Sequence, residues 1–263
     1  MGLAASSLSP YIGAMRTSNP FLTERAVGNA RREMAGSDEL MTVGGTVNKI
    51  SILLVVVALC AAASWSYATS GQLSSANVMP LMIGGGITAF VLSLIVSFKP
   101  NLAPALSIPF AIAEGLLLGV ISAIYQVGVY PAIVLHAVLL TVGTALSMFL
   151  LWRTGVIVVT QRMRSIVSTA MMGIVLVYLA TFVLSFFGVQ IPMIHEGGMI
   201  GIGFSVLVLV VASFMLLIDF DMIERMAQGG APKSMEWFGA FALLVTLVWL
   251  YMEFLRLLSK LRD

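Results

Sequence analysis

Three acidic side chains interrupt apolar stretches of this sequence and are the residues best suited to chemistry. Asp219 follows the apolar run from Phe214 to Ile218, and Glu253 and Glu114 each lie inside another apolar run. Placing an acid in a lipid-like segment costs roughly 2.5–3.5 kcal/mol, so such groups usually face the interior of a helical bundle or a water-filled path. These carboxylates are therefore candidates for binding protons or cations.

Asp219 and Glu253 form the candidate pair. The residues three and four positions from Asp219 are apolar, so no basic residue on its own helical face can neutralise it. Two carboxylates that face each other at low dielectric cannot both ionise cheaply and would share a proton, and their oxygens would attract a divalent cation. Simpler interpretations remain open: an interfacial charge for Asp219, and an i,i+3 ion pair with Arg256 for Glu253.

Two other charged residues, Glu114 and Lys99, each have two interpretations, and Asp221 has a simpler one. Glu114 has no basic neighbour in its helix, so it is either a third functional acid or a protonated acid bonded to another helix. Lys99 ends an apolar stretch at about the depth expected for Asp219, which would allow a gate-like ion pair. It is otherwise an ordinary basic anchor. Asp221 lies four residues before Arg225, which predicts a solvated ion pair at the end of a helix.

Other kinds of chemistry have no support in the sequence. His136 and His195 belong to no Cys/His cluster, and no P-loop, dinucleotide fingerprint or GxSxG motif is present. The single cysteine, Cys60, is expected to act as a small packing residue. A net charge of +2 is too small to suggest nucleic acid. We therefore expect neither an enzyme nor a protein with a bound cofactor.

The composition indicates whether water or lipid surrounds the folded chain. Of 263 residues, 59% are hydrophobic and 10% charged, and the mean hydropathy is +1.03. A soluble domain of this length cannot bury so much apolar surface, so lipid must surround most of the chain.

Seven apolar stretches are each near the ~20 residues that cross a bilayer as a helix. Short turns rich in Gly, Pro, Asn and Ser separate them, so successive helices should be antiparallel neighbours. The prediction is an all-α integral membrane protein with seven transmembrane helices, at residues 50–68, 80–98, 105–125, 132–151, 166–188, 199–218 and 237–258.

Basic residues predict the orientation. They occur in the N-terminal tail and in alternate loops, at Lys99 and at residues 153–164 and 225–233, whereas loops 70–79, 126–131 and 189–198 have none. The positive-inside rule then places the N-terminus in the cytoplasm. Seven crossings would leave the basic C-terminal end outside. Either the last helix crosses despite this charge or it is re-entrant, and its length favours crossing.

Small residues recur at helix-packing spacing. Gly115 and Gly119 form one GxxxG motif, Gly197 and Gly201 form another, and glycines fill positions 84–86. Such spacing lets helices approach closely in lipid.

Residues 1–49 differ from the rest, because they are polar and contain no apolar run of signal-peptide length. We expect a largely disordered cytoplasmic tail followed by a transmembrane domain at residues 50–263. Met15 is an alternative start.

Several segments of the chain resemble those of a known family. Leu217-Ile-Asp-Phe-Asp-Met-Ile and Leu250-Tyr-Met-Glu-Phe-Leu-Arg-Leu-Leu resemble the Bax inhibitor family of membrane proteins. Pro109-Phe-Ala-Ile-Ala-Glu-Gly-Leu and the turn from Arg153 to Arg164 are similar to the same family. Met15-Arg-Thr-Ser-Asn-Pro is similar to the start of bacterial members that have long tails.

The resemblance implies a fold in which six helices surround a central seventh, and a pH-sensitive calcium leak governed by acids on helices six and seven. Asp219 and Glu253 match these acids, and Lys99 falls near a basic residue that closes the pathway in some members. The chain departs from the family in having Glu for the second acid and Lys for the basic residue, and in a longer segment between the acids.

The expected function is a passive Ca²⁺ leak in a bacterial inner membrane, gated by protonation of Asp219 and Glu253, which would also form a transient Ca²⁺ site. The expected partners are the lipid bilayer, Ca²⁺ and protons. Two alternatives stay open: a non-transporting regulator that binds membrane proteases or other membrane proteins, and a proton-coupled transporter.

Overall fold

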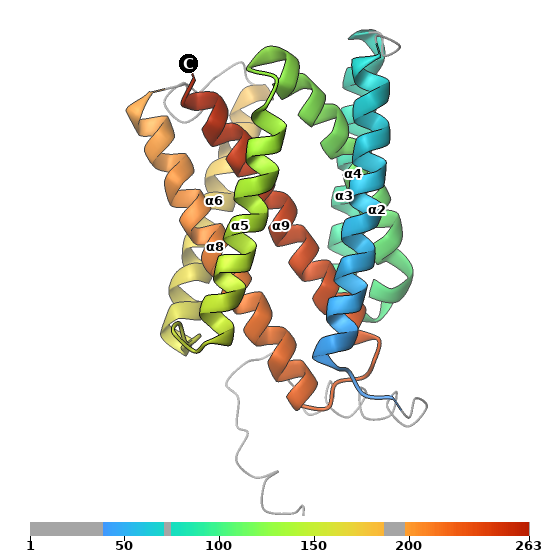
Figure 1. Ribbon diagram of the computed structural model, residues 1–263, viewed down its shortest axis with the longest axis vertical. Coiled ribbons are helices and arrows are strands. Elements are labelled where there is room, and N and C mark those ends of the chain that lie inside the picture. The colour runs from blue at the N-terminus through green and yellow to red at the C-terminus, as the bar shows by residue number, and fades with distance from the viewer. Residues whose placement is uncertain (1–38, 71–74, 187–197, 263) are drawn as a thin grey trace, which may run out of the picture. The chain divides into compact units, whose positions relative to one another are not determined.

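The computed structural model describes residues 39–70, 75–186 and 198–262, and this part of the chain is all-helical (Figure 1). Seven of its helices are long and apolar enough to cross a membrane, which confirms the predicted fold class. They are α2 (Val43–Thr69), α3 (Ser75–Phe98), α4 (Ala103–Gly128), α5 (Ile133–Arg153), α6 (Gln161–Phe186), α8 (Met199–Gln228) and α9 (Met235–Lys260). A short 3₁₀ helix, η2 (Pro100–Leu102), joins α3 to α4.

The last helix, α9, is the central one. It packs directly against α2, α4, α5 and α8, while α3 packs on α4 and α6 on α8. Tyr178 extends from α6 far enough to reach the α9 side chains. The expectation of a central seventh helix is confirmed in this form.

The seventh helix crosses the whole bundle. Near its start, Glu236 pairs with Lys49 in the second turn of α2. Near its end, the Lys260 ammonium donates to the Gly201 carbonyl at the start of α8, at 3.1 Å. Its 26 residues rise about 39 Å, more than the ~30 Å hydrocarbon core of a bilayer. The re-entrant alternative is therefore wrong, and the two ends of α9 lie at opposite ends of the bundle (Figure 1).

The GxxxG motif of α4 brings that helix close to α2. A Cβ on Gly115 would lie 2.7 Å from the Val57 carbonyl oxygen, and one on Gly119 would lie 2.0 Å from the Ser64 hydroxyl oxygen. Only glycine allows this approach, so the packing role predicted for the motif is confirmed. Gly84 has nothing near its missing side chain. Gly197 lies outside the described residues.

Several helix ends differ from the hydropathy boundaries. The sixth membrane helix, α8, runs on to Gln228, so Asp219 and Asp221 lie inside it and not at its end. Met222, Glu224 and Arg225 beyond the acids are good helix formers, whereas a hydropathy boundary stops at the first acid. The helix ends in a Gly-Gly turn, where Gly230 adopts φ +70° and the Ala231 N–H donates to the Met226 carbonyl at 3.0 Å.

The N-terminal boundary also shifts. Thr42 caps α2, which begins at Val43 within the expected tail, so residues 43–49 belong to the first membrane helix. The disorder predicted for the tail concerns mainly residues 1–38, which lie outside the described residues.

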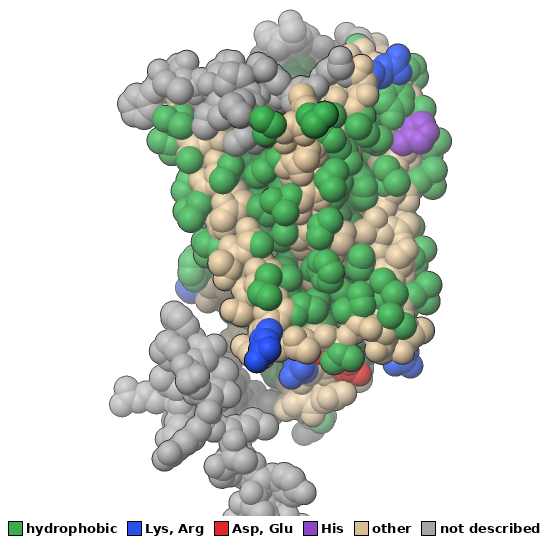
Figure 2. Space-filling view, turned by 90° about the vertical axis from the view of Figure 1, so that its left-hand side faces the viewer, with side chains coloured by type: hydrophobic (Ala, Val, Ile, Leu, Met, Phe, Trp, Pro, Cys, Tyr) green, Lys and Arg blue, Asp and Glu red, His purple; other side chains and the backbone are tan. Residues whose placement is uncertain are grey.

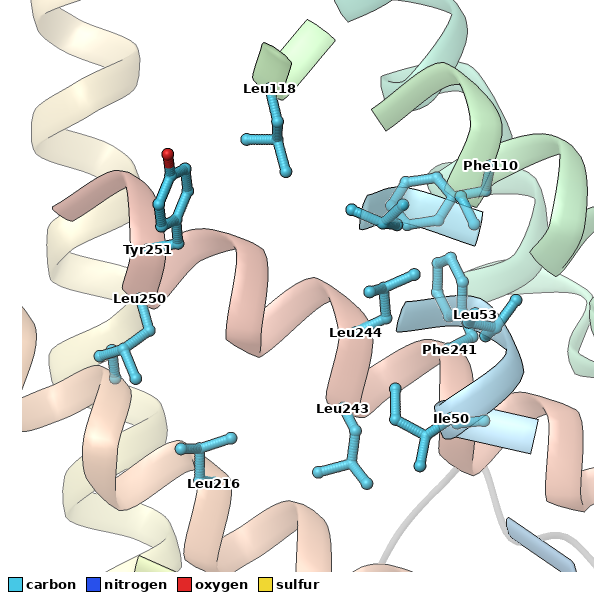
Figure 3. Packing of buried hydrophobic residues seen from close by; sticks show 14 of the residues in the cluster. Ile50, Leu53, Phe110, Leu118, Leu216, Phe241, Leu243, Leu244, Leu250 and Tyr251 are labelled. Carbon is cyan, nitrogen blue, oxygen red and sulfur yellow. The ribbon is translucent and has the colours of Figure 1, made fainter. Parts of the chain in front are cut away.

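Apolar side chains fill the core and also cover the outer surface, as expected for a protein surrounded by lipid. Buried leucines of α8 and α9 pack together, and Phe110 of α4 meets Phe241 edge-on at 4.9 Å between ring centroids (Figure 3). Apolar side chains also cover much of the outer face in Figure 2, with Lys and Arg gathered mainly toward one end. An apolar outer face matches a lipid environment.

Candidate functional site

Asp219 lies buried between α8 and α9. Its side chain is 6% exposed, and its Oδ2 accepts a 2.6 Å hydrogen bond from the hydroxyl of Thr246 on α9. Buried leucines of both helices, Leu216 and Leu244, belong to the same core cluster. No basic side chain in the described ranges forms an ion pair with Asp219. The interfacial, snorkelling alternative is therefore wrong for this residue.

Glu253 occupies a second and different environment. It is fully buried, and its Oε2 accepts hydrogen bonds from Arg256 Nη1 at 2.6 Å and from the Tyr178 hydroxyl at 3.1 Å. The Arg256 guanidinium also lies over the Tyr178 ring, 4.9 Å from its centroid. The i,i+3 ion pair with Arg256 is confirmed, and it joins a buried carboxylate to a guanidinium side chain that is 30% exposed.

One oxygen of Glu253 is left over. Its Oε1 is buried and has no hydrogen-bond partner among the residues that the structure describes. An unpaired buried carboxylate oxygen is costly, because it has lost its water without gaining a donor. This oxygen is therefore a place where a proton, a water molecule or a cation would be stabilising.

The structure does not bring Asp219 and Glu253 together. Thr246, which contacts Asp219, precedes Glu253 by seven residues on α9, or about 10.5 Å along the helix axis. No hydrogen bond or ion pair in the described part of the chain joins the two carboxylates. The hypothesis of a directly shared proton therefore lacks the geometry it needs. The two acids occupy separate positions along α9.

Lys99 is not paired with Asp219. It is exposed and stands at the junction between α3 and η2, where its backbone N–H donates to the Ile95 carbonyl at 2.8 Å. Asp219 lies nine residues before the end of α8, deeper than the hydropathy boundary suggested. Because the acid is deeper than expected, the structure supports the basic-anchor interpretation of Lys99.

Glu114 faces the central helix from α4. It lies between Phe110, which packs on Phe241, and Ser122, whose hydroxyl shares a 2.7 Å hydrogen bond with Tyr251. Its side chain is half-buried, and it has no hydrogen bond or ion pair among the residues that the structure describes. The hydrogen bond to another helix expected for a protonated acid is thus not observed.

Two hydroxyl groups were missed by sequence reasoning. Thr246 and Tyr178 each lie in an apolar helix and supply the hydrogen bonds of Asp219 and Glu253. A lone Thr or Tyr in a membrane helix is common, so only spatial proximity distinguishes these two. The predicted pair of Asp221 with Arg225 is present, at 2.8 Å. It is not solvated as expected, because Asp221 also pairs with Arg164 of α6 and its side chain is only 14% exposed.

Metal-binding capacity is limited. In the described ranges, no group of three or more His, Cys, Asp or Glu side chains could hold a metal ion. His136 bonds to Tyr130 at 3.3 Å, and His195 lies outside those ranges. Ca²⁺ takes six to eight oxygen ligands, whereas Asp219 and Glu253 each offer one carboxylate. Either acid could hold a passing, partly hydrated cation, but not a tightly bound one.

These features define a polytopic helical membrane protein whose central helix carries one buried acid, Glu253, and contacts another, Asp219. The chain matches the protein family described as Bax inhibitor 1 like over residues 19–263, and it therefore belongs to that family. The comparisons found no match among curated proteins and none among solved structures.

Proposed function

We propose that this protein is a passive calcium leak of a bacterial inner membrane, controlled by the protonation of Asp219 and Glu253. The observation that carries the proposal is the environment of Glu253. It is a fully buried acid, and one of its oxygens has no hydrogen-bond partner in the described part of the chain. A membrane protein retains such a group at a free-energy cost, so it is by default a functional one.

The two acids act as successive positions for a cation along α9. Within the described ranges, the Thr246 hydroxyl is the hydrogen-bond partner of Asp219 and it is neutral, so the negative charge of Asp219 is available to a cation. Glu253 is partly neutralised by Arg256, so a cation there competes with the guanidinium. Protonation of either carboxyl group removes the charge that attracts Ca²⁺ and leaves a neutral hydrogen-bonding group.

The orientation follows from the basic residues. Lys99, Arg153, Arg225 and Lys233 belong to the junctions at the end of the bundle where α2 and α9 begin. The positive-inside rule places this end in the cytoplasm. The basic exceptions at the other end are partly explained by their contacts, since Arg256 is paired with Glu253 and Lys260 is buried against α8.

The test is Ca²⁺ entry into proteoliposomes loaded with a calcium-sensitive dye, at about pH 6 and about pH 8, a range that spans neutral pH. Asp219→Asn and Glu253→Gln remove each charge with little change of shape. Glu224→Gln is the matched control, because Glu224 is a half-buried acid on the same helix as Asp219. We expect a pH-dependent flux that both site variants change and the control does not.

Other outcomes would overturn the proposal. Accumulation of a solute against its gradient would identify a proton-coupled transporter. Absence of flux at both pH values from well-folded protein would exclude a leak and favour a regulator that acts by binding membrane proteases or other membrane proteins.

A further inference from the structure

A carboxylate of the central helix is seated at the N-terminus of the first membrane helix. Glu236, in the first turn of α9, is 1% exposed. Its Oε1 accepts hydrogen bonds from the Thr42 backbone N–H at 2.9 Å and from the Thr42 hydroxyl at 3.0 Å. Its Oε2 pairs with the Lys49 ammonium. Both oxygens are therefore satisfied by groups from the start of α2.

This arrangement is a capping box whose acid comes from another helix. In an ordinary capping box, the N-cap hydroxyl accepts from the N–H of the third helical residue, and a Glu at that third position accepts from the N-cap N–H. Here Thr42 is the N-cap and accepts from the Gly45 N–H at 2.9 Å. The third position holds Gly45, so Glu236 supplies the second bond from 194 residues away.

The glycine at the third position makes this exchange sterically feasible. A Cβ on Gly45 would lie 2.1 Å from Glu236 Oε1, whereas one on the adjacent Gly44 would have nothing within 4 Å. Any side chain at position 45 would displace the carboxylate. A side chain at position 45 would therefore clash with Glu236, whereas one at position 44 would not. The two glycines provide a matched pair for experiment.

Electrostatics favour the seated carboxylate. Glu236 lies at the N-termini of both α2 and α9, where both helix dipoles are positive, and it accepts charge-assisted hydrogen bonds. Lys49 also lies over the Trp237 ring, 5.6 Å from its centroid. A backbone bond from Met41 N–H to the Ala231 carbonyl, at 2.8 Å, ties the same two segments together.

Close contacts between helices lie one turn further into the bundle from Glu236. At Gly239, a Cβ would lie 3.2 Å from Thr46 Cγ2 of α2 and 3.0 Å from Ile223 Cγ1 of α8. Three helices therefore meet closely just inside Glu236. If Glu236 left its seat, a carboxylate and an ammonium would lose their partners and would need water. Release therefore draws water into this end of the bundle.

We propose that Thr42, Gly45, Lys49 and Glu236 form a latch that closes the end of the bundle where α2 and α9 begin, and that its release opens the path to Asp219. The passage of calcium through the opened path rests on the proposed function, whereas the closure of the helices by the latch does not. The latch holds α9, the helix that also carries Thr246 and Glu253, and it thereby regulates the same site.

The decisive variant is Gly45→Glu. It restores the sequence of an ordinary capping box, so α2 keeps its cap, while the new carboxylate takes the Thr42 N–H and repels Glu236. Gly44→Glu adds the same charge one residue earlier, into open space. Glu236→Gln is a second release variant, which keeps the shape of the side chain and removes its charge.

Helix separation is measured by a disulfide cross-link between Thr46→Cys and Gly239→Cys, in a Cys60→Ser background. The close approach of these positions suits a disulfide, which needs Cβ atoms about 3.5–4.5 Å apart. We expect Gly45→Glu to slow cross-linking by about tenfold, in line with the loss of a charged hydrogen bond, and Glu236→Gln to slow it less. Gly44→Glu should cross-link at the parent rate. Size-exclusion chromatography confirms that each variant is folded.

Calcium flux is the second measurement of latch release. Gly45→Glu should raise the leak several-fold, and oxidation of the cysteine pair should abolish it until a reductant is added. Unchanged cross-linking in folded Gly45→Glu would overturn the latch. Slower cross-linking in the release variants, with no calcium flux in any protein, would support the latch and overturn the calcium leak.

Discussion

The hydroxyl of Thr246 on α9 donates a 2.6 Å hydrogen bond to the buried Asp219 carboxylate on α8. This bond fixes how the acid of the sixth membrane helix meets the seventh. It also explains why Asp219 and Glu253 are not a pair, since the α9 residue opposite Asp219 is a threonine and Glu253 lies two helical turns beyond it. Each acid therefore depends on its own neutral or charged partner.

Thr246→Val should destabilise the protein. The substitution keeps the shape of the side chain but leaves Asp219 buried without its donor, which costs about 1–3 kcal/mol. Thermal unfolding in detergent should show a lower Tm for Thr246→Val and a nearly unchanged one for Thr246→Ser, which retains the hydroxyl. Equal Tm values for the valine and serine variants would show that the bond contributes nothing.

Arg256→Gln should leave the negative charge of Glu253 without its compensating partner. Removing one partner of a buried ion pair costs about 3–5 kcal/mol, because the other charge is left without compensation. The double variant Arg256→Gln/Glu253→Gln should recover most of the loss in Tm. Added Ca²⁺ should stabilise the single variant more than the parent protein, since the cation can take the place of the guanidinium. Lack of recovery in the double variant would contradict this account of the pair.

Gly119→Ala should disrupt the close packing of α2 and α4. A Cβ at Gly119 would lie 2.2 Å from the backbone oxygen of Ala61, so the helices must separate, at a cost of about 1–3 kcal/mol. Gly143→Ala is the matched control, because nothing lies within 4 Å of its added Cβ. The Tm should fall for Gly119→Ala alone. A similar fall in both variants would mean that the effect is not one of helix packing.

The helices could be predicted from the sequence because each apolar stretch is long enough to cross a bilayer. Their ends could not, since α8 continues through Asp219, Asp221 and Arg225 to Gln228. Hydropathy measures whether a residue suits lipid, whereas a helix persists as long as its backbone bonds and side-chain pairs hold. The ion pair of Asp221 with Arg225 was predictable from its spacing, but the added contact with Arg164 of α6 was not.

The site could be predicted only in its individual residues. An acid in an apolar segment marked Asp219 and Glu253, and both are buried. Which residue faces which depends on the axial register of α8 against α9, and that register leaves no periodic signal in the sequence. Glu236 shows the same limit, because it resembles an ordinary first-turn acid until its bonds to Thr42, 194 residues away, are seen.

The two ends of α9 should be reached from opposite sides of the membrane. Lys233 lies just before the helix and Arg262 just after it, and the helix spans the bundle. In a Cys60→Ser background, a membrane-impermeant maleimide should label Arg262→Cys in intact spheroplasts, and Lys233→Cys only after the membrane is opened. Positive-inside orientation requires this order. Labelling of both positions from the same side would contradict the crossing of α9, and the reverse order would invert the orientation while leaving the crossing intact.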